Sequence, residues 1–345
     1  MTERGLADHP LAQLTLVRFR EFIREPEALF WVFLFPIILA AGLGIAFRNR
    51  PPEALRVVTP SAELARSLRT EKRLDVRLES ESAAAQELRT GKAVLEATPA
   101  GAGVAYHYDD TNPDGRTARM LADAAVQQAA GRVNPVRSRD ALVREPGSRY
   151  IDFLVPGLLG MNLMGSAIWG MGFAIVDARR KKLMKRLVAT PMPRRYYLMS
   201  FGLSRMVLLV LEVLVVLGFG ALAFGVPVRG SLVVLGALCV LGSLSFSAIG
   251  LLIASRARTI EAASGLMNAV MMPMWVVSGV FFSSQRFPDV VQPIIKALPL
   301  TAAIDALRIN MLQGGGLAQI APQTAVLGFW MVAGFSAALK MFRWK

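Results

Sequence analysis

The sequence is poor in the residues that hold metals or form disulfide bonds. Among 345 residues it has one cysteine, Cys239, and two histidines, His9 and His107. One cysteine cannot form a disulfide or a thiolate cluster within the chain, and neither histidine has a second cysteine or histidine at metal-ligand spacing. We therefore expect no disulfide framework and no metal site.

Motifs for catalysis and nucleotide binding are also missing. The only Gly-Lys pair, Gly91-Lys92, lacks the upstream glycine and the following hydroxyl residue of a phosphate loop. No nucleophile elbow and no H-E-x-x-H motif occurs. Asp109 and Asp110 are adjacent on an extended segment and point to opposite faces, so we interpret them as part of a turn and helix N-cap, not a catalytic pair. We expect no enzymatic activity and no cofactor on this chain, with energy supplied by another chain or by an ion gradient.

Charged residues are scarce at 19%, whereas hydrophobic residues make up 54% of the chain. This composition is typical of a membrane protein, not of the two soluble domains that the length would allow. Six apolar runs are long enough to cross about 30 Å of hydrocarbon. They cover 29–47, 151–176, 201–225, 231–255, 262–282 and 320–341. The first run is followed by Arg48-Asn49-Arg50 instead of a small-residue cleavage site, so we expect a retained span, not a signal peptide.

The positions of the basic residues predict an orientation. Seventeen lysines and arginines lie before residue 29, in 177–200, in 255–261 and from Lys340 onward, against four in the short segments of the opposite side. Because basic residues in short loops favour the cytoplasmic side, we expect both chain ends to be cytoplasmic and 48–150 to lie outside. This pattern accounts for the net charge of +14 without nucleic acid as a partner.

The segment 48–150 predicts a small extracytoplasmic α/β domain, because strand-like and helical stretches alternate along it. Nothing in its sequence indicates a ligand. The expected strands are 55–59, 74–78, 93–98 and 104–108, and the expected helices are 62–70, 82–90 and 116–130.

The segment 1–28 predicts an amphipathic helix. Apolar side chains recur at positions 12, 16, 19 and 23, with charged residues on the other side. We interpret it as a cytoplasmic helix on the inner membrane surface. A helix packed on a partner protein fits the same pattern, and both could hold.

Five residues within the spans are candidates for a substrate pathway. Glu212 lies near mid-bilayer, where an ionised carboxylate costs about 2.5–3.5 kcal/mol, so it must face protein or water. It either contacts substrate or forms hydrogen bonds with a neighbouring helix. Asn162 and Ser166 belong to a small, polar stripe that suits close helix contact or a cavity wall. Asn268 and Met272 suit an adaptable apolar wall or ordinary packing.

The most basic segment, 177–197, predicts a short helix on the cytoplasmic side. Leu183, Met184 and Leu187 form one apolar stripe with lysines and arginines around it, and Pro191 follows its end. Such a helix is either a positive-inside anchor or a cationic face for a cytoplasmic partner.

Several stretches resemble type-2 ATP-binding-cassette exporter permeases. The basic helix with Ala189-Thr190-Pro191 is similar to that family's coupling segment between the second and third spans. Residues 272–282, then Phe287-Pro288, then 298–308, resemble its fifth span and the outer half-helices before the sixth. Tyr150 to Leu159, with Pro156-Gly157, and the inserted outer domain fit too, so the resemblance covers essentially the whole chain. Many members carry Glu-Arg and a Gly-Thr-Leu run entering this helix, where this chain has Arg179-Arg180-Lys181-Lys182-Leu183, so its docking face is more basic than is typical of the family.

The resemblance implies a half-transporter. Two copies, or this chain and a close relative, would pair with two ATPase subunits that carry ATP and Mg. The complex would move a hydrophobic or amphipathic substrate, such as a drug, a lipid or a lipid-linked glycan, outward across a bacterial inner membrane. The ATPase-coupling residues would be Arg179, Arg180, Lys181, Lys182, Leu183, Met184, Leu187, Thr190 and Pro191.

The resemblance also implies a five-helix transmembrane domain at 151–345 with an outer re-entrant segment at 284–318. We expect Asp305 and Arg308, three residues apart on a short outer helix, to pair as a structural clamp. The outer gate residues would be Ser278, Gly279, Pro299, Asp305 and Arg308.

Two other classes of function remain as alternatives. An ion-coupled secondary transporter usually has inverted repeats, broken helices and several buried charges. Here only Glu212 is expected to be buried, and no internal repeat is evident. A membrane-anchored sensor or assembly protein would use 48–150 as its receptor, but six spans exceed what an anchor needs.

Overall fold

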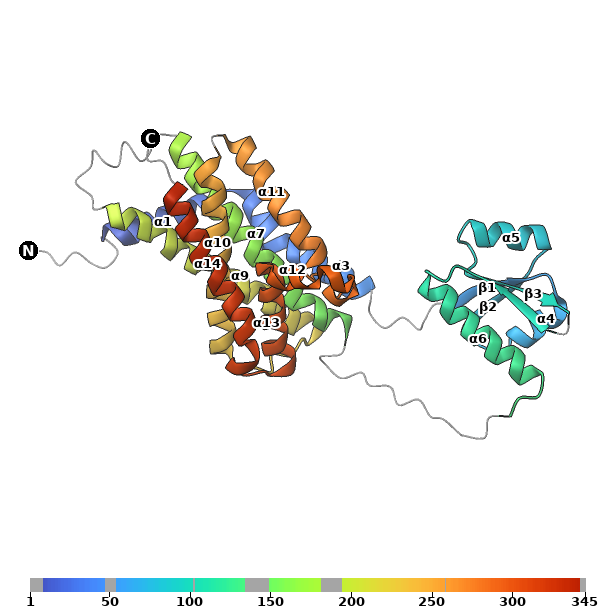
Figure 1. The fold of residues 1–345 in the computed structure, drawn as a ribbon. Coiled ribbons are helices and arrows are strands. Elements are labelled where there is room, and N and C mark those ends of the chain that lie inside the picture. The colour runs from blue at the N-terminus through green and yellow to red at the C-terminus, as the bar shows by residue number, and fades with distance from the viewer. Residues whose placement is uncertain are drawn as a thin grey trace, which may run out of the picture. The chain divides into compact units, whose positions relative to one another are not determined.

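The chain divides into two compact units (Figure 1), Met1–Arg48 with Val143–Lys345 and Asn49–Leu142. The computed structural model describes residues 9–46, 54–101, 103–133, 149–180, 194–257 and 259–341, without the side chains of 194–199 and 201. Each unit has its own hydrophobic core, and each is described by itself below.

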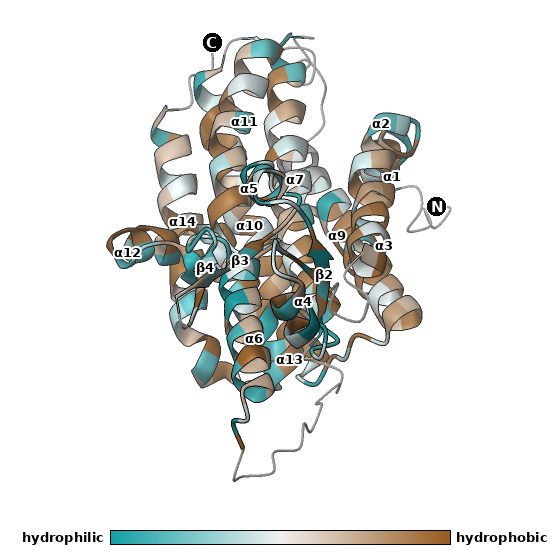
Figure 2. Ribbon diagram, turned by 90° about the vertical axis from the view of Figure 1, so that its right-hand side faces the viewer, coloured by the Kyte–Doolittle hydropathy of each residue, from teal (hydrophilic) through white to brown (hydrophobic). Residues whose placement is uncertain are grey.

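The larger unit consists of helices, and six of those in the described residues are long and apolar enough to cross a membrane. Figure 2 shows that α3 and α10 of the larger unit are mainly hydrophobic, whereas α5 and α6 of the smaller unit are mainly hydrophilic. This confirms the predicted α-helical membrane fold with six spans. The spans are Pro26–Ala46, Tyr150–Arg180 (α7), Gly202–Phe224 within α9 (Arg194–Phe224), Leu232–Arg256 (α10), Ile260–Val277 (α11) and Leu317–Met341 (α14).

A broken element precedes the last span, within the segment where a re-entrant element is expected. Short 3-10 helices at Ser284–Arg286 and Asp289–Val291 lead into α12 (Gln292–Ala297). The following helix, α13 (Pro299–Gln313), is bent by 84° from the Asp289–Ala297 stretch. Proline favours the first position of a helix, where its missing N–H costs no bond, so Pro299 suits the start of a new helix at this bend.

The first span is not a regular α-helix. It comprises α2 (Pro26–Leu29), a π-helical turn (Phe30–Leu34) and α3 (Phe35–Ala46). Pro36 has no N–H, so the carbonyl of Val32 cannot receive its usual intrahelical bond. The Asn162 amide on α7 donates to that carbonyl at 3.0 Å. A side chain from the second span therefore satisfies the group that the proline leaves without a partner.

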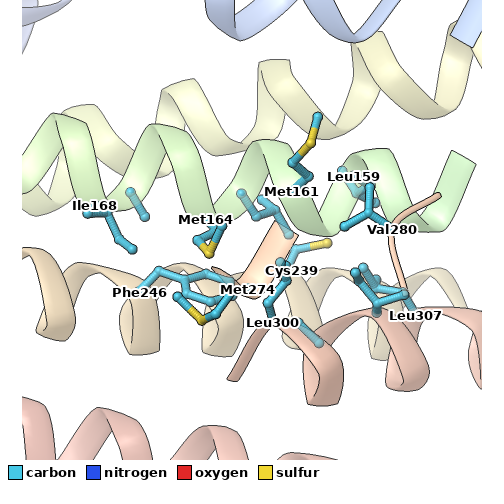
Figure 3. Packing of buried hydrophobic residues seen from close by; sticks show 14 of the residues in the cluster. Leu159, Met161, Met164, Ile168, Cys239, Phe246, Met274, Val280, Leu300 and Leu307 are labelled. Atoms are coloured by element: carbon cyan, nitrogen blue, oxygen red, sulfur yellow. The ribbon is translucent and has the colours of Figure 1, made fainter. Parts of the chain in front are cut away.

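The core of this unit forms around α7, where most residues of the span are buried, whereas only a minority of residues are buried in the spans of α9, α11 and α14. Helices in a bilayer associate by close packing, because lipid tails are as apolar as the side chains. Gly250 of α10 shows this closeness, since a Cβ added there would lie 2.7 Å from the Ile168 carbonyl oxygen of α7. Figure 3 shows the resulting cluster, which includes Met164 and Ile168 of α7, Cys239 and Phe246 of α10, and Leu300 and Leu307 of α13.

The predicted amphipathic helix is present as α1 (Pro10–Ile23), and it packs on α9 of the same chain. Arg18, expected on the polar side, donates from Nε to the Ser200 hydroxyl on α9 at 3.0 Å. Leu16 and Ile23, expected on the same face as Phe19, remain exposed, at 40% and 48% of their surface. The helix therefore has a protein-facing side that includes Arg18, whereas Leu16 and Ile23 remain exposed among the residues that the structure describes.

The smaller unit is an α/β domain with a four-stranded sheet in the order β2-β1-β3-β4. β1 pairs in parallel with β2 and β3, and β4 is antiparallel to β3. Helices α4 and α6 cover one face and α5 lies on the other (Figure 1). The strands are β1 (Leu55–Thr59), β2 (Leu74–Leu78), β3 (Leu95–Ala100) and β4 (Gly103–His107), and the helices are α4 (Ala62–Leu68), α5 (Glu81–Arg89) and α6 (Pro113–Ala129).

The acidic stretch before α6 is a turn and a helix cap, as predicted. Asp109 accepts hydrogen bonds from the Thr111 hydroxyl at 2.6 Å and the Thr111 N–H at 2.8 Å. These bonds lower the pKa of Asp109, the hydroxyl bond most. Asn112 caps the helix by accepting from the Asp114 N–H at 2.9 Å. The helix starts at Pro113, three residues earlier than predicted, because proline suits the first helical position.

Candidate functional site

The carboxylate of Glu212 is fully buried and paired with Arg205 on the same helix, α9. Arg205 donates from Nη1 to Oε1 at 2.8 Å and from Nη2 to Oε2 at 3.3 Å. The expectation that Glu212 is the only buried charge of the spans is wrong. The oppositely charged Arg205 is also largely buried, since only 11% of its side-chain surface is exposed. The spacing of seven residues, two helical turns, was a signal in the sequence that could have identified this partner.

Serines from two other helices complete the hydrogen bonds of this ion pair. The Ser166 hydroxyl of α7 donates to Glu212 Oε2 at 2.8 Å and accepts from Arg205 Nη2 at 2.8 Å. Arg205 also donates from Nε to the Ser243 hydroxyl of α10 at 3.2 Å. We call these four residues the charge network. It joins α7, α9 and α10, and its two charges offset each other, which is how buried charges in membrane helices are accommodated.

The predicted pathway residues do not form one site. Glu212 and Ser166 belong to the charge network, and Asn162 bonds the Val32 carbonyl of the first span. Asn268 and Met272 lie on α11, where both are exposed, Met272 at 59%. An amide on the surface of a membrane span is costly in hydrocarbon, so this face of α11 is expected to meet protein or water.

The end of α7 and the start of α9 flank the predicted coupling segment. Arg179, near the end of α7, donates from Nη1 to the Ala254 carbonyl of α10 at 2.9 Å. Arg180 is the last residue of α7, and α9 begins at Arg194. The other predicted coupling residues lie outside the described residues: Lys181, Lys182, Leu183, Met184, Leu187, Thr190 and Pro191.

Arg308 joins three segments at the opposite ends of these helices. From α13 it donates to the Phe153 carbonyl of α7 at 3.0 Å and to the Gly279 carbonyl after α11 at 2.6 Å. Its guanidinium carbon also lies 3.5 Å from the centroid of the Phe153 ring. The expected ion pair with Asp305 is not found within the described residues. The guanidinium is directed to carbonyl oxygens of two neighbouring segments instead.

The segment after α11 is fitted closely against α7. A Cβ added to Gly157 would lie 2.5 Å from the Val280 carbonyl oxygen, so only glycine fits there. The Tyr150 hydroxyl donates to the Phe281 carbonyl at 2.9 Å. Gly279 has a φ of +81°, a conformation that side chains disfavour. These contacts and Arg308 connect the start of α7, residues 278–282 and α13. We call this the outer junction, after the side on which the predicted orientation would place it.

The other gate candidates lie within or beside the outer junction. Ser278 is the buried C-cap residue that follows α11, and Pro299 is the buried first residue of α13. Arg149, just before α7, binds the carboxylate of buried Asp152 at 2.8 and 3.0 Å. This hydrogen bonding raises the pKa of Arg149. Tyr150 and Phe153 were missed as contributors because their partners, Phe281 and Arg308, are distant in sequence. The Arg149–Asp152 pair was also missed, although its spacing of three residues was a signal in the sequence.

Comparison with known proteins places the chain among transporters. Residues 26–340 match a family described as ABC-2 family transporter protein. The match includes both the membrane-spanning helices and the residues of the smaller unit.

Individual relatives have low sequence identity to this chain, and each aligns over part of its length. The chain is 29% identical over 196 residues to ABC transporter G family member 20 of Dictyostelium discoideum, an alignment covering 56% of this chain and 27% of that protein. It is 30% identical over 139 residues to the putative transport permease YvfS of Bacillus subtilis, covering 40% and 56%. It is 27% identical over 165 residues to the probable multidrug ABC transporter permease YbhS of Escherichia coli, covering 47% and 43%. The chain thus spans less than two thirds of each of these relatives.

Proposed function

The chain belongs to the ABC-2 family of transporter proteins, and from this premise we propose that it is the permease subunit of an ATP-driven exporter. The family match over 26–340 is the observation that carries the proposal. The printed sequence has no phosphate loop, so the ATP and Mg would be bound by a separate ATPase chain. Pairing of two permease chains, identical or closely related, would complete the membrane part.

We propose that both chain ends face the cytoplasm of a bacterial cell and that the smaller unit lies outside. The excess of basic residues in the short segments on one side supports this orientation. Two of the relatives carry the word permease in their names, and one of these, from Escherichia coli, carries the word multidrug. A hydrophobic or amphipathic substrate, such as a drug, a lipid or a lipid-linked glycan, suits spans that are predominantly apolar.

Coupling to the ATPase would take place between α7 and α9. The segment from 181 to 193 connects their ends, and those ends are attached to neighbouring helices by Arg179 and by the bond from Arg18 to Ser200. A displacement of this segment would therefore be transmitted to α10 and α1, as well as to α7 and α9, which it connects.

The charge network does not favour an ion-coupled mechanism. A carboxylate that carries protons across a membrane must gain and lose them as it faces water. Glu212 is fully buried, and both of its oxygens accept hydrogen bonds from Arg205. This arrangement supports a structural role for the carboxylate.

The coupling proposal is tested by aspartate substitutions on the predicted docking stripe. Leu183→Asp and Leu187→Asp should each reduce the ATPase that co-purifies with the permease at least tenfold. The reason is that an unpaired charge buried at a docking surface costs several kcal/mol, and about 1.4 kcal/mol corresponds to a factor of ten. The measurement is quantitative pull-down of the ATPase encoded beside the permease gene.

The matched control is Val290→Asp, which adds the same charge at an exposed position far along the chain. This variant should bind the ATPase as the unaltered protein does. Full ATPase binding and full transport by both Leu183→Asp and Leu187→Asp would remove this helix from the mechanism.

A further inference from the structure

The Ser166 hydroxyl of α7 has two hydrogen-bond acceptors at the same distance. Its oxygen lies 2.8 Å from Glu212 Oε2 on α9 and 2.8 Å from the backbone carbonyl oxygen of Asn162, which is four residues earlier on its own helix. A serine hydroxyl carries a single proton, so it donates fully to only one of them at a time. Ser166 therefore satisfies its donor either across the interface between α7 and α9 or within α7 alone.

The α9 side of this interface also keeps its partners when α7 is removed. Arg205 and Glu212 are both on α9, and both carboxylate oxygens accept hydrogen bonds from the guanidinium. If α9 moved away from α7, the two charges would remain paired. Arg205 lies close to the start of the span Gly202–Phe224, so its Nε, which donates to Ser243 in the closed arrangement, would reach water at the membrane surface. Separation of the two helices therefore leaves no buried charge unpaired.

The start of α7 and the end of α9 are held together by different contacts. A Cβ added to Gly220 of α9 would lie 3.1 Å from Val155 Cγ1 of α7, so the two helices approach closely there. Arg149, just before α7, donates from Nη2 to the carbonyl of Gly225, just after α9, at 3.3 Å. These contacts are far from the coupling segment, and they provide a point about which α9 can turn.

The interface between α7 and α10 differs, because these two helices meet backbone to backbone. A Cβ added to Gly250 of α10 would lie 2.7 Å from the Ile168 carbonyl oxygen of α7. A Cβ added to Gly172 of α7 would lie 3.3 Å from the Gly250 carbonyl oxygen. Such close packing is what holds helices together in a bilayer. The span of α9 has only a minority of buried residues, so α9 is the helix that is free to move against this pair.

We propose that α9 separates from α7 at the end beside the coupling segment, turning about its contact with Val155, and that Ser166 makes this movement reversible. The bond from Ser166 to Glu212 holds the interface closed. When the interface opens, the hydroxyl turns to the Asn162 carbonyl, as serines in helices do, and avoids the cost of an unsatisfied buried donor. Helix α1, which packs on α9, moves with it. The proposal concerns the helices of the permease alone, so it stands or falls separately from the ATP-driven function.

The test is double electron–electron resonance on the purified full-length protein in phospholipid nanodiscs, with spin labels on Arg180→Cys and Leu203→Cys in a Cys239→Ala background. These positions are the last residue of α7 and an exposed residue near the start of α9. Ser166→Ala removes the bond that closes the interface and leaves no hydroxyl without an acceptor on α7. It should raise the ratio of long to short distances about threefold or more, the effect of one interhelical hydrogen bond in a membrane. Ser243→Ala removes the bond between the guanidinium and α10, and it should change the ratio in the same direction.

Two controls accompany this measurement. A second pair of labels, at Arg180 and Arg256, joins the last residues of α7 and α10, and its distance should stay the same in every variant. Ser264→Ala is the matched variant, since Ser264 of α11 donates to the Ile260 carbonyl of its own helix at 2.8 Å, and it should leave both distances unchanged. If neither of the two network serine variants changes the distances of the first pair, the proposal is overturned. An equal change in the second pair would overturn it as well, because it would indicate a general loosening of the bundle.

Discussion

The ion pair between Arg205 and Glu212 places two charges inside a bundle of apolar helices. Both ends of the pair are hydrogen-bonded, and serines from α7 and α10 take part. Replacing a buried ion pair by apolar groups is often neutral, whereas removing one partner leaves an uncompensated charge and costs about 3–5 kcal/mol. The charge network therefore predicts strong coupling between substitutions at its two ends.

We predict that Arg205→Met and Glu212→Leu will each lower the yield and thermal stability of the permease in detergent, and that the double variant will recover most of both. Glu212→Gln should lose less stability than Glu212→Leu, because the amide can still bond Arg205 and Ser166 although it leaves the arginine charge uncompensated. The measurement is fluorescence-detected gel filtration after stepwise heating.

Val210→Leu, at a 57% exposed position of the same helix, serves as the control. If the double variant is as unstable as the less stable of the two single variants, the cost of each substitution does not come from leaving the other charge unpaired, and the prediction is wrong. A Glu212→Gln protein that is stable but prefers different substrates would place Glu212 on the pathway.

At the residue level, the sequence shows which polar groups in the spans need a hydrogen-bond partner, but it does not show which residues are the partners. Glu212 was predicted to face protein or water. Ser166, which bonds Glu212, and Ser243, which bonds Arg205, lie on other helices, and no local sequence pattern predicts either contact. Asn162 and the carbonyl left by Pro36 are a similar case, separated by more than a hundred residues. For Arg308 the prediction chose Asp305, the nearest carboxylate in the sequence, and it was wrong. The guanidinium instead donates hydrogen bonds to backbone carbonyls of two segments that pack against it.

At the scale of elements, periodicity and length predicted most of the fold. Hydrocarbon thickness sets the length of a span, so the six apolar runs correspond closely to the six span helices. The alternating pattern also placed all four strands of the smaller unit to within two residues at their starts. The π-helical turn of the first span and the face of α1 that meets α9 were not predicted, since both depend on tertiary contacts.

The smaller unit should fold without the membrane helices. Its core lies between the sheet and the α4 and α6 face, with Leu68 fully buried there. We predict that an isolated fragment, Asn49–Leu142, unfolds cooperatively with a free energy of about 5–10 kcal/mol, and that Leu68→Ala lowers it by about 2–5 kcal/mol. Urea unfolding followed by circular dichroism measures both values.

Arg66→Ala is the control for that fragment, because Arg66 lies on the exposed side of the same helix, α4. It should change the free energy of unfolding by less than about 0.5 kcal/mol. A fragment without a cooperative transition would mean that this unit depends on the rest of the chain.

At the scale of the whole molecule, the architecture suits force transmission between two ends of a helical bundle. The proposed coupling segment lies between α7 and α9 in the sequence, and the charge network attaches both of these helices to α10. At the other end the outer junction fixes α7 to α13 and to the end of α11. Movement at the coupling segment would thus reach the outer junction through α7, the most buried helix.

The central claim is that ATP hydrolysis on a partner chain drives export through this permease. The most direct test reconstitutes the permease and its ATPase in proteoliposomes and follows one cationic and one neutral lipophilic fluorescent compound. We predict movement of at least one compound that requires both proteins and hydrolysable ATP, and that continues when ionophores dissipate the ion gradients. Movement that proceeds without the ATPase and stops when the gradients are dissipated would contradict the claim.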